Sequence, residues 1–169
     1  MEKQENIMPQ PQGGVPNKTE KHESGALFNK ALVIEDQEGP LEMLIAALSK
    51  TDIPFDVAKW YLQAEEMIRN GGYDLVFLDH RMPRNDPGCT DSEDFDKFCV
   101  QLENIGYNLT GLIRETLPDA AIVGTSSMSE TGGDIDAKIS KLDILEEGYL
   151  DDILHEVSTK MHLKNRGRD

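Results

Sequence analysis

The fold is decided by residues 73–83, which read YDLVFLDHRMP. Within them, residues 75–78 form an unbroken apolar run, which is typical of a strand buried on both faces in a parallel sheet. The run ends at the carboxylate of Asp79, and Pro83 prevents the strand from pairing further. Open α/β sheets bind their ligands at the carboxyl ends of their strands, so Asp79 is a candidate site residue. An isolated aspartate there serves as often to cap the next loop, so the rest of the chain must decide.

Strand and helix patterns alternate along the rest of the chain. Alternation of this kind implies a parallel sheet covered by helices on both faces. Five such units match the flavodoxin-like strand order 2-1-3-4-5, so the predicted fold class is α/β, a doubly wound five-stranded parallel sheet with an inserted helix after strand 3. The other strands are predicted at residues 30–34, 53–57, 120–123 and 138–142, and the helices at about 40–48, 64–68, 106–114 and 145–161.

Length, charge and composition limit the classes of protein. The chain has 169 residues, enough for one domain with its own core. Its 17 basic and 32 acidic residues give a formal net charge of −15, which argues against non-specific nucleic-acid binding. With two cysteines and no apolar run long enough to span a membrane, we expect a cytoplasmic protein. We expect a disordered tail at residues 1–28, which are polar and rich in Pro and Gly, one domain at 29–163 and a basic tail at 164–169.

Acidic residues end the first predicted strand as well as the third. These strands are neighbours in the predicted order, so Glu35, Asp36 and Asp79 meet at one edge of the sheet, with Thr125 and a lysine of the last strand opposite. Adjacent carboxylates repel one another, and a divalent cation removes that conflict. Oxygen ligands with an incomplete protein shell favour Mg²⁺, beside which a carboxylate can accept a phosphoryl group. A hydroxyl and an ammonium group would stabilise the charge of that group during transfer.

The combination of these segments resembles a response-regulator receiver domain of two-component signalling, over roughly residues 29–163. Residues 30–37, KALVIEDQ, resemble the opening strand and acidic pair of that family. Residues 74–83 resemble its phosphorylation-site strand, and Gly124-Thr125-Ser126 stands where the family has its switch hydroxyl. Ile139-Ser140-Lys141 resembles the segment that ends in the site lysine.

The resemblance assigns a role to each of the three acidic residues of the predicted site. Asp79 would be the phosphoacceptor, and Glu35 and Asp36 would hold Mg²⁺ directly or through water. The backbone carbonyl of Arg81 would be another metal ligand, which leaves the side chain at that position free to vary. Because a buried neutral role suits His80 better, we do not expect it to take part in phosphotransfer.

The resemblance also assigns the hydroxyl and the ammonium group. Thr125 would bond to the phosphoryl group and move with it, and Lys141 would pair with a phosphoryl oxygen. Lys138 is the rival for the second role, and Lys141 is preferred because the two residues before it resemble the strand of the family. The chain departs from the family in having Lys138 in place of a switch aromatic and Leu142 in place of a proline. The short segment between Thr125 and Lys141 also predicts a reduced fourth helix.

Residues 84–105 are an insertion between the third strand and the third helix of the resemblance. They open with the turn-forming residues 85–88, after which Thr90 or Ser92 would cap a helix. We expect this helix to pack against the body of the domain, and a lid or partner surface beside Asp79 is the alternative. Its predicted apolar face consists of Phe95, Phe98, Cys99 and Leu102.

The function expected from the resemblance is that of a stand-alone receiver, not an enzyme, because little chain follows the last helix. It would accept a phosphoryl group from a sensor histidine kinase or phosphotransfer protein and signal to an output protein or along a relay. Nucleic acid and membrane partners are not expected, and a homodimer stays open. The alternative is a receiver-like interaction module that works without phosphorylation. A flavodoxin-type ligand site is disfavoured by the acids at 35–38, and a phosphatase of the haloacid dehalogenase type would need an aspartate where Arg81 stands.

Overall fold

A five-stranded sheet forms the centre of the molecule in a computed structural model that describes residues 26–125 and 133–167. The strand order is β2-β1-β3-β6-β7, and every neighbouring pair runs parallel. This is the flavodoxin-like order, so the predicted α/β fold class is confirmed. In chain order the strands are β1 (Ala31–Ile34), β2 (Phe55–Ala58), β3 (Leu75–Leu78), β6 (Ala121–Gly124) and β7 (Ala137–Lys138).

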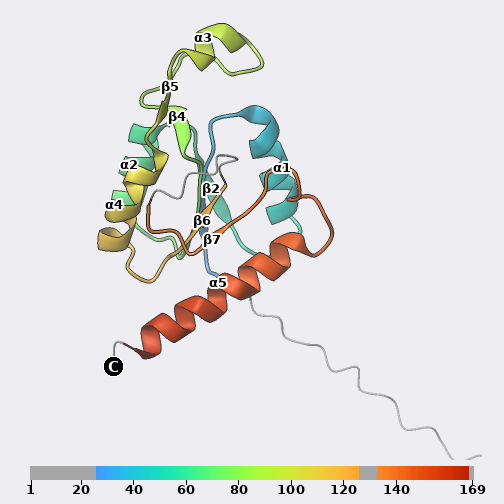
Figure 1. The fold of residues 1–169 in the computed structure, drawn as a ribbon, viewed down its shortest axis with the longest axis vertical. Coiled ribbons are helices and arrows are strands. Elements are labelled where there is room, and N and C mark those ends of the chain that lie inside the picture. Colours follow the sequence, from blue (N-terminus) through green and yellow to red (C-terminus); the bar gives the residue numbers. More distant parts are fainter. Residues whose placement is uncertain (1–25, 126–132, 168–169) are drawn as a thin grey trace, which may run out of the picture.

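Helices cover both faces of the sheet (Figure 1). Successive side chains of a strand point to opposite faces, so the buried strands supply two apolar clusters. Val33 and Phe77 belong to one cluster, and Leu32 and Val76 belong to the other. The first cluster is closed by α1 (Glu38–Leu48) and α5 (Tyr149–Arg166), and the second by α2 (Tyr61–Asn70) and α4 (Leu109–Thr116), which follows the short 3₁₀-helix η1 (Gly106–Asn108).

The register of the sheet brings three strand ends side by side. Ile34 lies opposite Leu78, and Leu78 lies opposite Gly124, which are the last residues of β1, β3 and β6. The next backbone amides continue the ladder: Asp79 N donates to the carbonyl of Ile34 at 3.0 Å, and Thr125 N donates to that of Leu78 at 3.0 Å. The residues that follow these strands therefore share one edge of the sheet.

The last strand of the sheet is shorter than predicted. The strand expected at residues 138–142 is the two-residue β7, which pairs only with Val123 and Gly124 at the end of β6. Since β6 stops there, residues beyond Ile139 have no strand to pair with, and the chain turns away. That turn carries Lys141 toward the carboxylates.

Both ends of the domain differ from the predicted boundaries. Phe28, which was assigned to the tail, is buried in the core, so the folded body includes residues before 29. The last helix begins at Tyr149 rather than about 145, after Gly148 with its φ of 78°. It continues through Arg166, so Lys164 and Arg166 of the predicted tail belong to its last turn, whereas Arg168 lies outside the described residues. Cations there offset the negative end of the helix dipole.

The insertion is a hairpin with a short helix at its tip, a shape that the sequence did not predict. Its strand β5 (Leu102–Asn104) pairs antiparallel with β4 (Arg81–Pro83), which directly precedes the insertion, and α3 (Phe95–Cys99) lies between them in the chain. The helix is capped by Asp94, whose side chain accepts from Lys97 N, instead of Thr90 or Ser92. It also ends before Leu102, which lies in β5.

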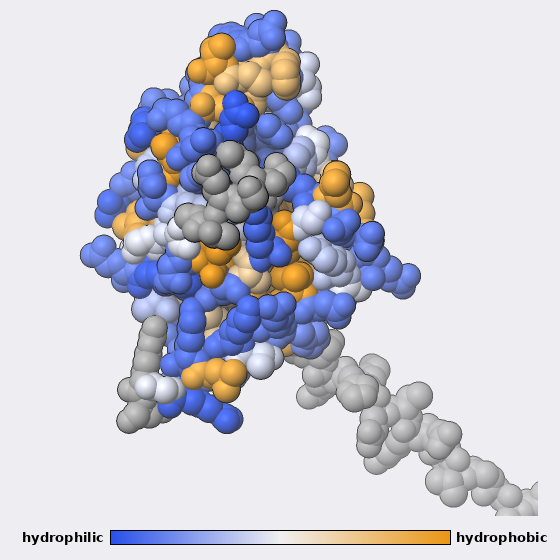
Figure 2. Space-filling model, viewed as in Figure 1, coloured by the Kyte–Doolittle hydropathy of each residue, from blue (hydrophilic) through white to orange (hydrophobic). Residues whose placement is uncertain are grey.

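The insertion contacts the body of the domain, as expected. Phe98 of α3 is buried, Asp91 accepts a hydrogen bond from Glu38 N at the start of α1, and the Arg84 carbonyl accepts one from Leu62 N in α2. Figure 2 shows a mostly hydrophilic face with several small hydrophobic patches, one of which lies at the end that α3 forms. Phe95 in α3 and Val100 just after it are exposed there.

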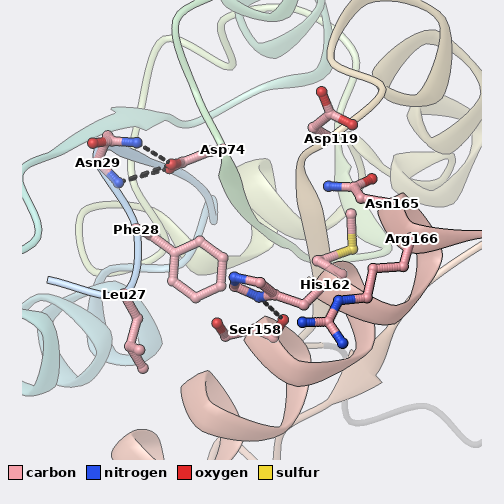
Figure 3. Close-up of a pocket in the computed structure, with 10 residues that line it drawn as sticks. Leu27, Phe28, Asn29, Asp74, Asp119, Ser158, His162, Asn165 and Arg166 are labelled. Carbon is pink, nitrogen blue, oxygen red and sulfur yellow. Dashed lines mark hydrogen bonds between the residues drawn. The ribbon is translucent and has the colours of Figure 1, made fainter. Parts of the chain in front are cut away.

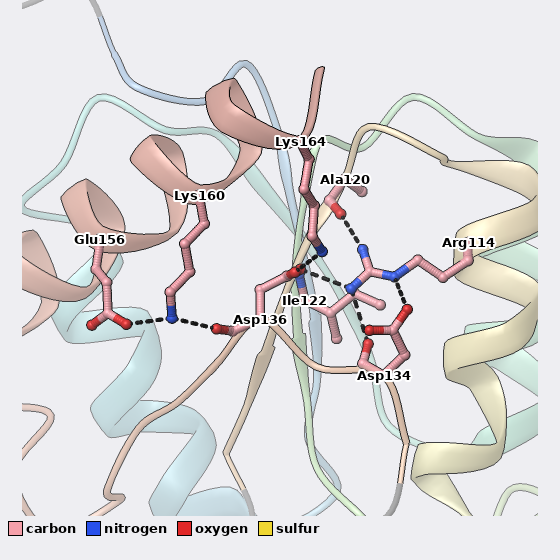
Figure 4. A network of polar contacts seen from close by, with 8 residues as sticks. All are labelled: Arg114, Ala120, Ile122, Asp134, Asp136, Glu156, Lys160 and Lys164. Carbon is pink, nitrogen blue, oxygen red and sulfur yellow. Dashed lines mark hydrogen bonds and ion pairs between the residues drawn. The ribbon is translucent and has the colours of Figure 1, made fainter. Parts of the chain in front are cut away.

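An ion-pair network fixes the segment before β7 (Figure 4). The side chain of Asp136 is buried and accepts from Arg114 of α4, from Lys164 of α5 and from Ile122 N in β6. Burial alone would raise the pKa of Asp136, but these hydrogen bonds outweigh it and lower the pKa. The predicted reduced fourth helix falls mainly on residues 126–132, outside the described residues, and 133–136 contain no helix.

No helix in the described ranges is both long and apolar enough to cross a membrane.

Candidate functional site

Three carboxylates meet at the carboxyl edge of the sheet. Glu35 and Asp36 follow β1, and Asp79 follows β3, so the parallel strands carry all three to the same edge. Each is at least 96% buried, and each offers an oxygen within 4.8 Å of the others. The predicted meeting of the acidic residues is therefore what the structure has.

A lysine from the loop after β7 reaches into this cluster. Lys141 Nζ lies 2.8 Å from Glu35 Oε2 and 3.0 Å from Asp79 Oδ2. Lys138, the rival in the sequence, lies in β7 and its side chain is exposed. The structure thus brings the preferred lysine to the proposed acceptor.

Burial and mutual repulsion make the acidic pair hard to ionise. Burial raises the pKa of Glu35 to about 7, and the charge of Asp79 adds to the rise against the opposing effect of Lys141. Burial raises the pKa of Asp36 to about 8, reinforced by the charges of Glu35 and Asp79. The pKa of Lys141 would fall by burial alone, but its two carboxylate partners raise it. One ammonium group does not compensate three carboxylates.

Two residues of this edge have buried polar atoms that find no hydrogen-bond partner among the described residues. These atoms are both carboxylate oxygens of Asp36 and the hydroxyl oxygen of Thr125. Buried polar groups are normally satisfied, and an exception suggests an absent ligand. Carboxylate oxygens that face two further carboxylates suit a hard divalent cation, and the free hydroxyl suits an anionic group beside it. The residues present therefore fit Mg²⁺ held by Glu35, Asp36 and Asp79.

The backbone around Asp79 is held tightly from the side of the insertion. Gly106 N donates to the His80 carbonyl at 2.8 Å, and a Cβ on Gly106 would stand 1.9 Å from the carbonyl oxygen of Asp79. Only glycine permits this approach. His80 Nδ1 accepts a hydrogen bond from Tyr107 N at 3.2 Å, which ties the ring to the segment after the insertion. Arg81 begins β4 with an exposed side chain, and the role of its carbonyl as a metal ligand stays a prediction.

Gly106 and Tyr107 also border this site, and neither is among the residues predicted for it. The sequence predicts only the start of a third helix at this point. The available signal was a glycine followed by a large aromatic residue where the insertion returns to the acceptor strand. Only the path of the hairpin shows that this pair closes against Asp79 and His80.

A separate cavity of about 510 Å³ lies at the opposite edge of the sheet (Figure 3). Asn29, Asp74 and Asp119, which precede strands β1, β3 and β6, line one side of it, and α5 lines the other with residues such as His162. Asp74 is occupied there by hydrogen bonds from Asn29. Since it faces the amino ends of the strands, this cavity is not part of the carboxylate site.

Comparison with known proteins supports the fold. No protein-family model and no curated protein sequence matches the chain. Among solved structures, the signal receiver domain of an HD domain-containing protein from Pseudomonas fluorescens Pf-5 matches with a TM-score of 0.58 at 20% identity, over 79% of this chain and 97% of that one. The chain has the receiver-domain fold.

Two further receiver structures agree with that assignment. The response regulator TrrA from Thermotoga maritima in complex with Mg²⁺-BeF matches with a TM-score of 0.53 at 22% identity, over 79% of this chain and 98% of that one. The N-terminal domain of a response regulator/sensory box/GGDEF protein from Carboxydothermus hydrogenoformans matches with a TM-score of 0.56 at 14% identity, over 83% and 100%. The predicted resemblance to receiver domains is thus confirmed for the fold.

Proposed function

We propose that the protein is a receiver that accepts a phosphoryl group on Asp79 in the presence of Mg²⁺. The observation that carries the proposal is the buried cluster of Glu35, Asp36 and Asp79 with the ammonium group of Lys141 between two of its members. A receiver fold supplies the context, and the unsatisfied oxygens of Asp36 and Thr125 supply places for a cation and an anion.

The transfer itself needs few protein groups. An oxygen of Asp79 forms the bond to phosphorus while the bond between phosphorus and its donor breaks, and the donor leaves with that electron pair. Lys141 already contacts Asp79 Oδ2, and it would neutralise charge on a phosphoryl oxygen. The Thr125 hydroxyl would donate to another oxygen. Mg²⁺ bound by the carboxylates supplies positive charge that offsets the negative charge of the incoming group.

The partners of this activity are proteins. A sensor histidine kinase or phosphotransfer protein would supply the phosphoryl group, and an output protein or a relay would read it. The protein would work in the cytosol as a signalling component and not as an enzyme with turnover. A receiver-like interaction module without phosphorylation is the second candidate, favoured by the exposed hydrophobic residues Phe95 and Val100 on the insertion.

The deciding experiment is intact-mass spectrometry after incubation with acetyl phosphate, with and without Mg²⁺. We expect a gain of one phosphoryl group that needs Mg²⁺ and is absent in Asp79→Asn. Asp74→Asn, at the other end of the same strand, is the matched control and should still gain the group. If the wild-type protein neither gains mass nor binds beryllofluoride with Mg²⁺, the interaction module becomes the better function.

A further inference from the structure

A third residue near the carboxylate edge has a buried polar atom without a partner. In the described part of the chain, the side chains with such atoms are those of Asp36, Thr125 and Tyr107. The first two belong to the proposed acceptor site. Tyr107 is 4% exposed and belongs to η1, which follows the insertion. A hydroxyl that is buried without a partner costs free energy, so a state that gives it a partner is favoured over one that does not.

The ring and backbone of Tyr107 are fastened to the acceptor segment. Tyr107 N donates to His80 Nδ1 at 3.2 Å, and the two rings lie 4.5 Å apart between centroids. The preceding residue, Gly106, presses against the carbonyl of Asp79 and donates to that of His80. A displacement of the backbone at Asp79 would therefore move Tyr107 as well.

The hydroxyl of Tyr107 lies against the end of β6. A Cβ added to Gly124 would stand 2.7 Å from that oxygen, so the absence of a side chain at Gly124 makes room for it. Gly124 is the residue before Thr125 and lies opposite Leu78, the residue before Asp79. Tyr107 thus bridges the acceptor strand and the strand that carries the proposed switch hydroxyl.

The electrostatic surroundings keep this hydroxyl protonated and sensitive to the acceptor. Burial raises the pKa of Tyr107, and the charge of Asp79 raises it further, whereas Lys141 lowers it. The group therefore keeps its proton at neutral pH and can donate a hydrogen bond. Because the charges of Asp79 and Lys141 both act on this hydroxyl, a charged group that binds between these two residues will act on it as well.

We propose that Tyr107 is a positioning residue of the acceptor site. When a phosphoryl group on Asp79 draws Thr125 toward that group, the Tyr107 hydroxyl gains a hydrogen bond to the Gly124–Thr125 segment. The proposal rests on the proposed function. The protein with a phosphoryl group on Asp79 (the loaded state) satisfies a polar group that the protein without it (the unloaded state) leaves unsatisfied. The hydroxyl then favours the loaded state over the unloaded one.

The test compares Tyr107→Phe with the wild-type protein, using beryllofluoride with Mg²⁺ as the probe. Phenylalanine keeps the stacked ring and removes only the hydroxyl. We expect about tenfold weaker beryllofluoride binding, the size of one hydrogen bond, with an unloaded melting temperature that is unchanged or higher. A merely structural tyrosine would lower the melting temperature and leave the affinity alone.

Tyr73→Phe is the matched control because its hydroxyl has a partner far from the acceptor. Tyr73 donates to Asp56 Oδ2 at 2.7 Å, so its loss should lower the melting temperature and leave beryllofluoride affinity unchanged. Gly124→Ala tests the contact itself. It should weaken beryllofluoride binding in the wild-type background and less in Tyr107→Phe, because that variant removes the nearest atom to the new Cβ, the Tyr107 oxygen at 2.7 Å, and leaves Ile135 Cδ1 at 3.0 Å in both backgrounds.

The outcomes separate this inference from the proposed function. If the wild-type protein binds no beryllofluoride with Mg²⁺, the proposed function fails and takes the inference with it. If the wild-type protein binds it and Tyr107→Phe binds it equally well, the role of Tyr107 is wrong while the acceptor function stands. Equal effects of Gly124→Ala in both backgrounds would likewise overturn the coupling between Gly124 and Tyr107.

Discussion

The charge set of Glu35, Asp36, Asp79 and Lys141 is unfavourable without a further cation. One ammonium group faces three buried carboxylates, so the protein holds protons on the acidic pair that water would remove. A divalent cation can take the place of those protons, because carboxylates release them when they bind a metal. Stability, proton binding and metal binding are therefore linked at these residues.

We expect the metal-free protein to lose stability between pH 6 and pH 8.5. The pKa values of Glu35 and Asp36 are raised on folding, so the folded state binds protons more tightly than the unfolded state. Their stabilising protonation is complete below about pH 4 and is lost as the pH rises through about 7 and 8. Melting temperatures measured in EDTA should fall across this range, and Mg²⁺ should flatten the fall.

Asp36→Asn is the control for that pH dependence. The neutral amide cannot ionise, so the stability of the variant relative to the wild-type protein should rise by roughly 2 kcal/mol from pH 6 to pH 8.5, and the two proteins should converge only near pH 4. The variant should also respond less to Mg²⁺. A wild-type melting temperature that does not change from pH 6 to pH 8.5 in EDTA would show that burial does not hold these protons.

At the scale of single residues, the sequence predicted which carboxylates meet but not which residues surround them. Glu35, Asp36 and Asp79 follow apolar runs, and the ends of neighbouring parallel strands must coincide, so their meeting follows from the pattern. The contact of Gly106 with Asp79 depends on where a 22-residue insertion returns, and no periodicity encodes that. The pairing of Lys141 with Glu35 similarly depends on the turn after β7.

Among the elements, the central strands and the last helix were predictable, whereas the last strand was not. β1, β3 and β6 are buried on both faces, which leaves continuous apolar runs in the sequence. β7 has two residues, too few for any pattern to be read. It is held in part by polar contacts of the preceding Asp136, which link α4, β6 and α5.

We expect Asp136→Asn to lower the free energy of unfolding by about 3 kcal/mol, since it leaves Arg114 and Lys164 without their shared buried anion. Urea denaturation followed by circular dichroism measures the loss. Asp134→Asn is the matched control, because Asp134 is exposed and its ion pair with Arg114 should contribute less than about 1 kcal/mol. Equal losses in the two variants would contradict the role assigned to burial.

The molecule as a whole carries a formal net charge of −15, which includes the three buried carboxyl groups at one edge of the sheet. Any cation will reduce general self-repulsion by screening, whereas a cation bound among the carboxylates stabilises only the folded state. These two effects can be separated because screening depends on ionic strength and site binding depends on the identity and concentration of the ion. The receiver fold predicts the second effect for Mg²⁺.

We therefore expect Mg²⁺ with beryllofluoride to raise the melting temperature well above that in NaCl of equal ionic strength. Ligand at about 100 times its Kd contributes about 2.7 kcal/mol, which corresponds to roughly 5–10 °C for a domain of this size. Asp79→Asn should keep the response to NaCl and lose the further rise, since screening needs no acceptor. If matched NaCl gives the full rise, or if Asp79→Asn retains it, the stabilisation comes from the −15 charge of the whole surface and the carboxylate edge is not a binding site.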